Sequence, residues 1–173
     1  MKGPILSAAA NSRMPCAEYL PLKRLAAVIA REKKAGKTIV LANGGFDLIH
    51  VGHIRYLQQA KAKGDILVVA LNSDSSLRRL KGAGRALIDE EGRVRIISAL
   101  ACVDYVTLFS EATVGRVLLA ITPHIHCKGS DYTLDSIPER DIVQSYGGRM
   151  AIAGGEKVRS TSLLIRKIKE LYG

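Results

Sequence analysis

The chain has 173 residues, which suits one compact domain, and its hydrophobic fraction of 47% is enough to bury a core. Only 5% of the residues are aromatic and Trp is absent, so we expect a core of Val, Ile, Leu and Ala, as in buried parallel sheets. The formal net charge of +10 favours anionic partners, either nucleic acid or phosphorylated small molecules. The three Cys residues lack a CxxC spacing, which argues against a disulfide framework and against a zinc site.

The N-terminal segment lacks the long apolar stretch of a signal peptide, and the apolar runs elsewhere are too short to span a membrane. We therefore expect a cytoplasmic protein with no membrane partner. Residues 1–18 are rich in Ala, Ser, Gly and Pro and show no clear periodicity. We interpret them as a flexible leader and predict one domain over residues 19–173.

Strands and helices are predicted to alternate after this leader. Apolar residues at helical spacing predict a first helix from about Leu22 that ends at Gly36. Ser136 and Glu139 have the spacing of a capping box, which predicts a helix running to about residue 146. The other predicted elements are strands at 39–42, 66–71, 105–108, 125–127 and 149–152, and helices at 51–63, 90–101, 114–121 and 162–171. This order predicts an α/β fold, a Rossmann-like, doubly wound parallel sheet that binds ligands at the carboxyl ends of its strands.

The segment after the first long strand, residues 43–53, carries the strongest chemical signal. Its glycines allow the backbone to turn sharply and to approach a ligand closely. His50 and His53 are three residues apart at the start of a predicted helix, which places both imidazoles on one side of its first turn. Backbone N–H groups and the helix dipole point to the same place, so the segment predicts a phosphate site. A helix cap or a metal-binding histidine pair are the alternatives, although no third metal ligand is evident nearby.

Several segments together indicate a family. The stretch from Gly45 to His53 resembles the GxFDxxHxGH signature of the cytidylyltransferase-like nucleotidyltransferases. Other stretches resemble one branch of that family, the ADP-heptose synthases: Asn-Ser-Asp at 72–74, Arg-Leu-Lys-Gly at 79–82, Arg93, and Lys-Gly-Ser-Asp-Tyr at 128–132. The resemblance runs from about Leu20 to the C-terminus, in the same order and with matching spacing.

The resemblance assigns roles to individual residues. It implies that His50 and His53 contact the triphosphate and stabilise a pentavalent transition state, and that Lys81 and Lys128 lie near phosphates, so we predict these four as catalytic. The residues expected to contact the nucleotide are Gly44, Gly45, Phe46, His50, Gly52, His53, Arg93, Lys128, Ser160, Thr161 and Ser162. The residues expected to contact the acceptor are Asp47, Asn72, Asp74, Lys81 and Asp131.

Plainer interpretations exist for several of these residues. Lys81 lies in a basic run, which is usually solvated surface. Residues 160–162 and Asp47 could be ordinary helix caps, and Arg93 could simply be exposed on its helix. His124 and His126 belong to no motif, and we interpret them as strand or loop residues.

The resemblance implies transfer of AMP from ATP to D-glycero-D-manno-heptose 1-phosphate, giving ADP-heptose and pyrophosphate for lipopolysaccharide core or related glycans. Mg²⁺ is expected with ATP, held mainly by phosphates, and no metal site made of side chains is predicted. The alternative is a cytidylyltransferase acting on glycerol 3-phosphate or a similar alcohol phosphate. A basic nucleic-acid-binding module is the rival from another class, and the scarcity of aromatic residues for base stacking argues against it.

Two expectations concern the wider assembly. Many members of the branch carry a sugar-kinase domain ahead of this one, and the chain has too few residues for it, so we expect a stand-alone form. Apolar faces predicted on the first and last helices make a homodimer possible.

Overall fold

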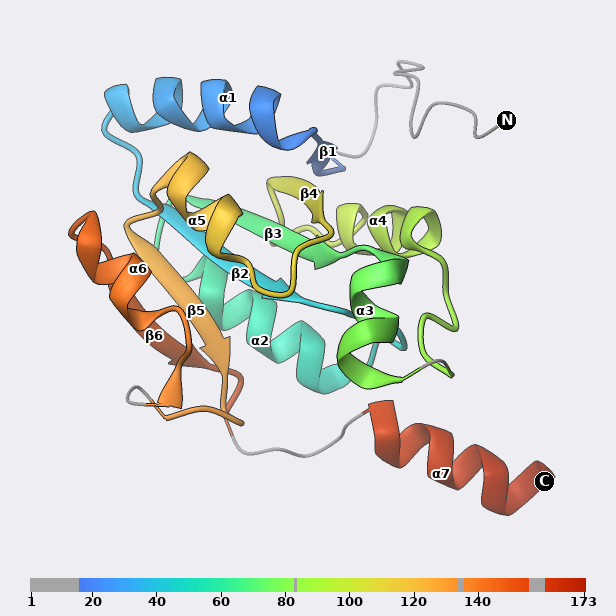
Figure 1. Ribbon diagram of the computed structural model, residues 1–173. Helices are drawn as coiled ribbons and strands as arrows, with labels where there is room; N and C mark the ends of the chain where they lie inside the picture. Colours follow the sequence, from blue (N-terminus) through green and yellow to red (C-terminus); the bar gives the residue numbers. More distant parts are fainter. Residues whose placement is uncertain (1–15, 83, 134–135, 156–160) are drawn as a thin grey trace.

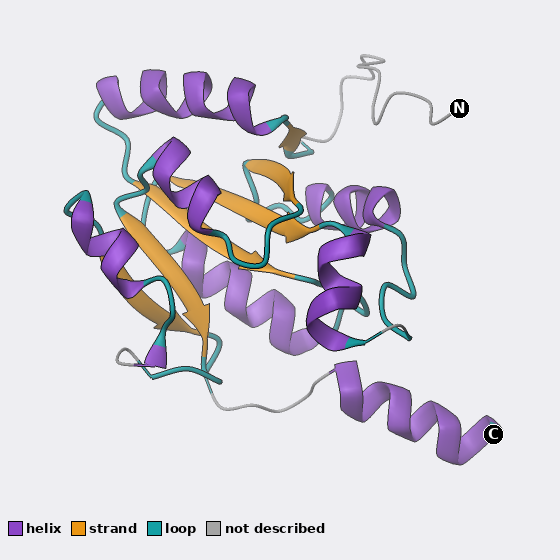
Figure 2. Ribbon diagram, in the orientation of Figure 1, coloured by secondary structure: helices purple, strands orange, loops and turns teal. Residues whose placement is uncertain are grey.

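A six-stranded sheet in the order β1-β4-β3-β2-β5-β6 forms the centre of the part of the chain that the computed structural model describes, residues 16–82, 84–133, 136–155 and 161–173 (Figures 1 and 2). All its strand pairs are parallel. The strands are β1 (Glu18–Tyr19), β2 (Ile39–Gly44), β3 (Ile66–Asn72), β4 (Tyr105–Phe109), β5 (Ile125–Gly129) and β6 (Arg149–Ala153). The predicted Rossmann-like α/β fold is confirmed.

The strand order reverses next to β2. The chain leaves β2 towards β3 and β4 and later returns to place β5 on the opposite side of β2. Ala42 of β2 is consequently in register with Val69 of β3 and with Cys127 of β5. In open parallel sheets a ligand crevice forms at this reversal, outside the carboxyl ends of the strands.

Helices cover both faces of the sheet (Figure 1). One face carries α1 (Leu22–Lys34), α5 (Gly115–Ile121) and α6 (Arg140–Ser145), and the other carries α2 (Val51–Lys61) and α4 (Glu90–Ser98). The strands supply a separate apolar core to each face, because their successive side chains alternate between the two. The short helix α3 (Asp74–Lys81) lies at the carboxyl edge, and α7 (Thr161–Tyr172) projects away from the sheet with no buried residue.

Two elements were not predicted. Strand β1 pairs with β4, and Ala17 just before it is buried and donates its N–H to the Ser98 carbonyl at 2.8 Å. The proposed leader therefore extends too far, since residues 17 and 18 belong to the domain, while residues 1–15 lie outside the described residues. Helix α3 is short and mostly polar, so it shows no apolar period, and the Ser73 side chain caps it by accepting the N–H of Ser76 at 3.2 Å.

The predicted capping box is wrong. Helix α6 begins at Arg140, and its N-cap residue Glu139 makes no capping hydrogen bond with its side chain. The hydroxyl of Ser136 instead accepts the N–H of Thr133 at 2.9 Å, in a local turn. The carboxylate of Glu139 cannot cap the helix because it is buried and pairs with Lys128 on β5.

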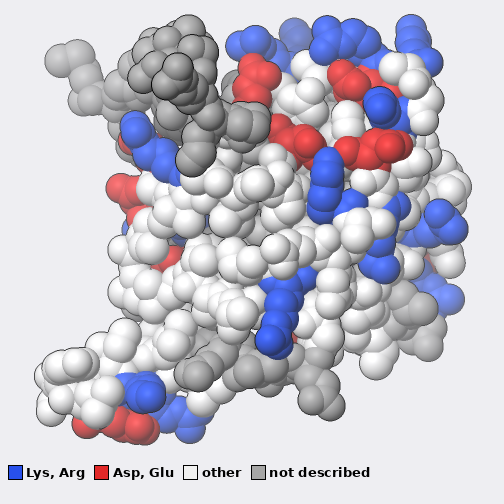
Figure 3. All heavy atoms as spheres, turned by 180° about the vertical axis from the view of Figure 1, so that it is seen from behind, with Lys and Arg blue, Asp and Glu red and all other residues white. Residues whose placement is uncertain are grey.

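Charged side chains are mixed on the face opposite to the view of Figure 1. Figure 3 shows Lys and Arg on this face in separate groups, with acidic and uncharged residues between them. None of the helices within the described ranges combines the length and the apolar character that crossing a membrane requires.

Candidate functional site

A cavity of about 700 Å³ opens at the carboxyl ends of β2, β3 and β5, where the strand order reverses. Most of the residues predicted for the site line it, although they come from five separate stretches of the chain. They are Gly44, Gly45, Phe46, Asp47, His50, Gly52, His53, Asn72, Lys81, Lys128, Asp131, Thr161 and Ser162. Ser160 lies outside the described residues, and Arg93 and Asp74 do not line the cavity.

His50 and His53 form a stacked pair at the start of α2. His50 is the N-cap residue, its carbonyl accepts the N–H of His53 at 2.9 Å, and the two ring centroids lie 3.8 Å apart. Phe46 packs against the second ring, with the centroids 5.1 Å apart. Local backbone geometry therefore fixes both imidazoles at one cavity wall.

Both imidazoles are neutral at pH 7. Burial lowers the pKa of His50. Burial first, and then the neighbouring His50 imidazole and the Lys81 ammonium, lower the pKa of His53 to about 4. The Nδ1 atoms of both rings are buried and make no hydrogen bond within the described residues. A neutral imidazole still donates one N–H, so the pair can contact phosphate oxygens without carrying charge before the ligand binds.

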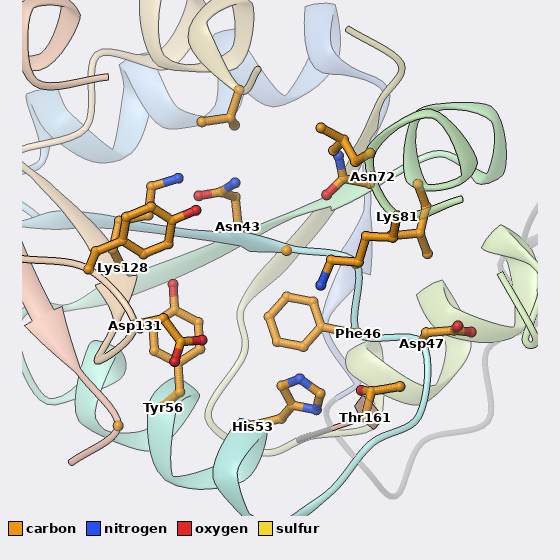
Figure 4. Close-up of a pocket in the computed structure, with 18 of the residues that line it drawn as sticks. Asn43, Phe46, Asp47, His53, Tyr56, Asn72, Lys81, Lys128, Asp131 and Thr161 are labelled. Carbon is orange, nitrogen blue, oxygen red and sulfur yellow. The ribbon is translucent and has the colours of Figure 1, made fainter. Parts of the chain in front are cut away.

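Lys81 and Lys128 approach the cavity from opposite sides (Figure 4). Lys81 is exposed at the last turn of α3. Lys128 on β5 is buried, its Nζ lies 3.1 Å from Oε2 of Glu139, and it sits 5.2 Å from the centroid of the Tyr132 ring. Two ammonium groups around a histidine pair form a site suited to phosphate groups.

Arg93 lies behind the cavity wall: it is not exposed on its helix, and it does not line the cavity. Its side chain is fully buried and donates at 2.7 Å to the carbonyls of Gly45 and Asn72. It also donates at 2.7 Å to the carboxylate of Asp74 and at 3.1 Å to the carbonyl of Ile88. Arg93 thus joins the loop after β2 to the end of β3, and Asp74 serves as its counter-ion outside the cavity.

Asp47 and Asn72 each use only part of their hydrogen-bonding capacity within the described residues. Asp47 is buried, its Oδ1 accepts the N–H of Ile88 at 3.0 Å, and its Oδ2 accepts no hydrogen bond from the described residues. The amide of Asn72 donates to the hydroxyl of Ser76 at 3.0 Å. The second carboxylate oxygen of Asp47 is thus buried without a partner among the described residues, and the side-chain oxygen of Asn72 is not engaged by Ser76.

The start of α7 reaches the cavity from the far end of the chain. The Thr161 hydroxyl donates to the Leu48 carbonyl at 3.4 Å, and the Ser162 hydroxyl accepts from Arg85 at 2.8 Å. Both hydroxyls line the same cavity as the histidine pair. No group of three or more potential metal-ligating side chains occurs in the ranges that the structure describes.

Some cavity residues were missed from the sequence. Asn43 stands in the glycine-rich segment and could have been recognised there, because it directly follows a buried apolar run. Tyr56, Arg85 and Glu139 also line the cavity. No local signal marks these three, since their position depends on contacts between distant parts of the chain.

Most of this chain is similar to known proteins. The model of the cytidylyltransferase-like family matches residues 41–173. Two proteins named "Bifunctional protein HldE", from Geobacter sulfurreducens and Geobacter metallireducens, are both 50% identical to this chain, over 149 and 152 residues. These matches cover 86% and 88% of this chain but 30% and 31% of the relatives, so the chain spans about a third of their length.

A solved structure is also similar. It is the lipopolysaccharide core biosynthesis protein from Thermoplasma volcanium GSS1, which is 33% identical, with a TM-score of 0.58. The match covers 68% of this chain and 94% of that one.

Proposed function

Since the chain belongs to the cytidylyltransferase-like family and is a nucleotidyltransferase, we propose that it transfers AMP from ATP to D-glycero-D-manno-heptose 1-phosphate. The products are ADP-heptose and pyrophosphate. The observation that carries the proposal is the stacked pair of His50 and His53 at the start of α2, in a cavity lined by Lys81 and Lys128.

The reaction needs positioning and charge neutralisation more than covalent help from the protein. An oxygen of the acceptor phosphate attacks the α-phosphorus of ATP and forms the new P–O–P linkage. The bond from the α-phosphorus to the bridging oxygen breaks, and pyrophosphate leaves with that electron pair. The attacking phosphate is already an anion, so no side chain has to remove a proton from it.

Each cavity group then has a defined task. The N–H groups of His50 and His53 and the N-terminus of α2 stabilise charge on the triphosphate. Lys81 and Lys128 neutralise the phosphates from both sides of the cavity, and the Ser162 hydroxyl, which only accepts a hydrogen bond from Arg85, donates to the leaving pyrophosphate. Mg²⁺ would accompany ATP, bound mainly by phosphate oxygens, which are the ligand type that this ion prefers.

The choice of acceptor is supported by the relatives. The HldE proteins are half identical to this chain, and the similar solved structure is described as a lipopolysaccharide core biosynthesis protein. The stretches at 72–74 and 128–132, through which the chain resembles ADP-heptose synthases, contribute Asn72, Lys128 and Asp131 to the cavity.

Pyrophosphate release tests the proposal. Wild type is assayed with ATP, CTP, GTP and UTP, each paired with either anomer of the heptose 1-phosphate or with glycerol 3-phosphate. We expect release with ATP and the heptose phosphate, and a kcat at least about 100-fold lower in His53→Ala, as for loss of one transition-state donor.

His124→Ala is the matched histidine control. His124 does not line the cavity, and it accepts the N–H of Ile39 at the opposite end of the sheet. Its substitution should leave kcat close to that of wild type. Release only with CTP and glycerol 3-phosphate would keep the mechanism and replace the substrates. No release from any pair by folded protein would reject the proposal.

A further inference from the structure

The cavity has two chemically different sides, divided by the end of β2. Figure 4 shows Asn43, Asn72 and Lys128 on one side of this strand, and Phe46, His53 and Tyr56 on the other. The first three side chains project towards the face of the sheet that carries α5, because they continue the alternation of the residues that pack there. We call this part, lined by Asn43, Asn72, Lys128, Thr113 and Glu139, the α5-side lobe.

The α5-side lobe places polar side chains next to the apolar core on this face of the sheet. Leu41 and Ala70, which lie two positions before Asn43 and Asn72 on the same face of β2 and β3, are completely buried in the core. A buried amide in such surroundings is unfavourable unless it is hydrogen-bonded. Asn72 meets this need through Ser76, at 3.0 Å. The partner of Asn43 lies on the neighbouring strand β5.

That partner is His126, whose Nε2 lies 3.0 Å from Oδ1 of Asn43. The imidazole is completely buried, and burial together with the charge of Lys128 lowers its pKa to about 3. It is therefore neutral and carries one N–H. Its Nδ1 is buried and has no partner within the described residues. A proton on Nδ1 would be an unpaired buried donor, so the favoured tautomer carries it on Nε2 and donates to Oδ1 of Asn43.

This contact determines what Asn43 offers to a ligand. With its side-chain oxygen occupied by His126, Asn43 presents its NH₂ group, and both donors of that group remain available in the cavity. Across the α5-side lobe, Asn72 keeps an amide oxygen and Thr113 a hydroxyl, whereas the carboxylate of Glu139 is paired with Lys128. Hydrogen-bond donors and acceptors therefore both line the α5-side lobe, which suits sugar hydroxyls, since each of these both donates and accepts.

We propose that the α5-side lobe holds the sugar of the acceptor, that Asn43 recognises its hydroxyl groups, and that His126 is a positioning residue that fixes the orientation of Asn43. This inference rests on the function proposed above. The histidine pair and the N-terminus of α2 lie on the opposite side of β2 and suit the triphosphate. Lys128, on the lobe's own side, can contact the acceptor phosphate as it approaches the α-phosphorus.

Two substitutions at one position separate positioning from packing. His126→Leu keeps the bulk and removes the donor, whereas His126→Gln places an amide N–H where Nε2 lies. We expect His126→Leu to raise the KM for the heptose 1-phosphate about 10-fold, which is the effect of one misplaced neutral hydrogen bond. The KM for ATP should stay within about 2-fold of wild type, and His126→Gln should restore most of the acceptor affinity.

Asn43→Ala gives a second and independent readout, because it leaves the buried histidine in place and depends less on the folding of a core variant. We expect the same rise in the acceptor KM, together with weaker discrimination between the heptose phosphate and glycerol 3-phosphate. Unfolding temperatures of all three variants show whether a change in kinetics follows a change in stability.

The outcomes distinguish the two proposals. Wild type that makes no ADP-heptose rejects the proposed function and this inference with it. Wild type that makes ADP-heptose, with an unchanged acceptor KM in Asn43→Ala, overturns only the inference. An equal rise of both KM values in His126→Leu, without rescue by His126→Gln, also overturns it, since that pattern is the one expected of a purely structural histidine.

Discussion

The ammonium of Lys128 lies 3.1 and 3.2 Å from the two carboxylate oxygens of Glu139, and the two side chains are only 8% and 6% exposed. The pair joins the end of β5 to the start of α6 inside the wall of the cavity. Removing one partner of such a buried pair leaves the other charge uncompensated in surroundings of low polarity, whereas replacing both partners by apolar groups is often tolerated.

Glu139→Ala should therefore lower the free energy of unfolding by about 3 kcal/mol. The same substitution in a Lys128→Met background should cost much less, because no uncompensated ammonium remains. Urea denaturation of the four proteins of this double-mutant cycle measures the coupling. Additive effects of the two substitutions would show that the ion pair does not determine the stability of this region.

Arg93 and Arg78 offer a matched comparison, because both pair with Asp74. The guanidinium of Arg93 is completely buried at 2.7 Å from the carboxylate, whereas that of Arg78 is 51% exposed at 3.8 Å. Lysine cannot reproduce the several hydrogen bonds of a buried guanidinium. We expect Arg93→Lys to cost about 3 kcal/mol of stability, and Arg78→Lys less than about 0.5 kcal/mol.

The kinetics of Arg93→Lys then test its place in the site. Arg93 holds the loop after β2 and the end of β3, so kcat/KM should fall for ATP and for the acceptor alike. A rise in the KM for ATP alone would instead indicate a direct contact with the nucleotide.

Acid should destabilise the protein through its buried histidines. The pKa of His126 is about 3 in the folded protein, and the ordinary value is 6.5. Between these values the unfolded chain binds a proton that the folded protein does not, so stability is complete above about pH 6.5 and falls as the pH decreases. At pH 5 this single group should cost about 2 kcal/mol.

His126→Gln removes this contribution while keeping the hydrogen-bond donor. The loss of stability between pH 7 and pH 5, measured by urea denaturation, should be about 2 kcal/mol smaller in the variant than in wild type. Carboxylates titrate alike in both proteins, so their contributions to the loss of stability cancel when the two losses are subtracted. Equal losses would mean that His126 is protonated in the folded protein at pH 5.

Local patterns were enough to predict the order of most elements. Apolar runs and helical spacing report burial and periodicity over a few neighbouring residues, so all five strands predicted from Ile39 onward are present, as is the helix start that holds His50 and His53. Strand β1 and helix α3 escaped prediction because a two-residue strand and an eight-residue polar helix carry too little periodic signal. Both depend on neighbours that are distant in the chain.

The roles of individual side chains also fall into those that local sequence predicts and those that only the folded structure shows. The sequence by itself determined that two histidines flank Gly52 at a helix start, and that Lys128 follows a strand at the edge of the sheet where ligands bind. Only the tertiary structure decided that Arg93 is buried between the loop after β2 and the end of β3, that Glu139 pairs with Lys128 and that His126 contacts Asn43. The physical reason is that a local pattern reports which side chains face inward, whereas the partner of a buried polar group comes from another strand or helix that only the folded chain brings within hydrogen-bonding distance.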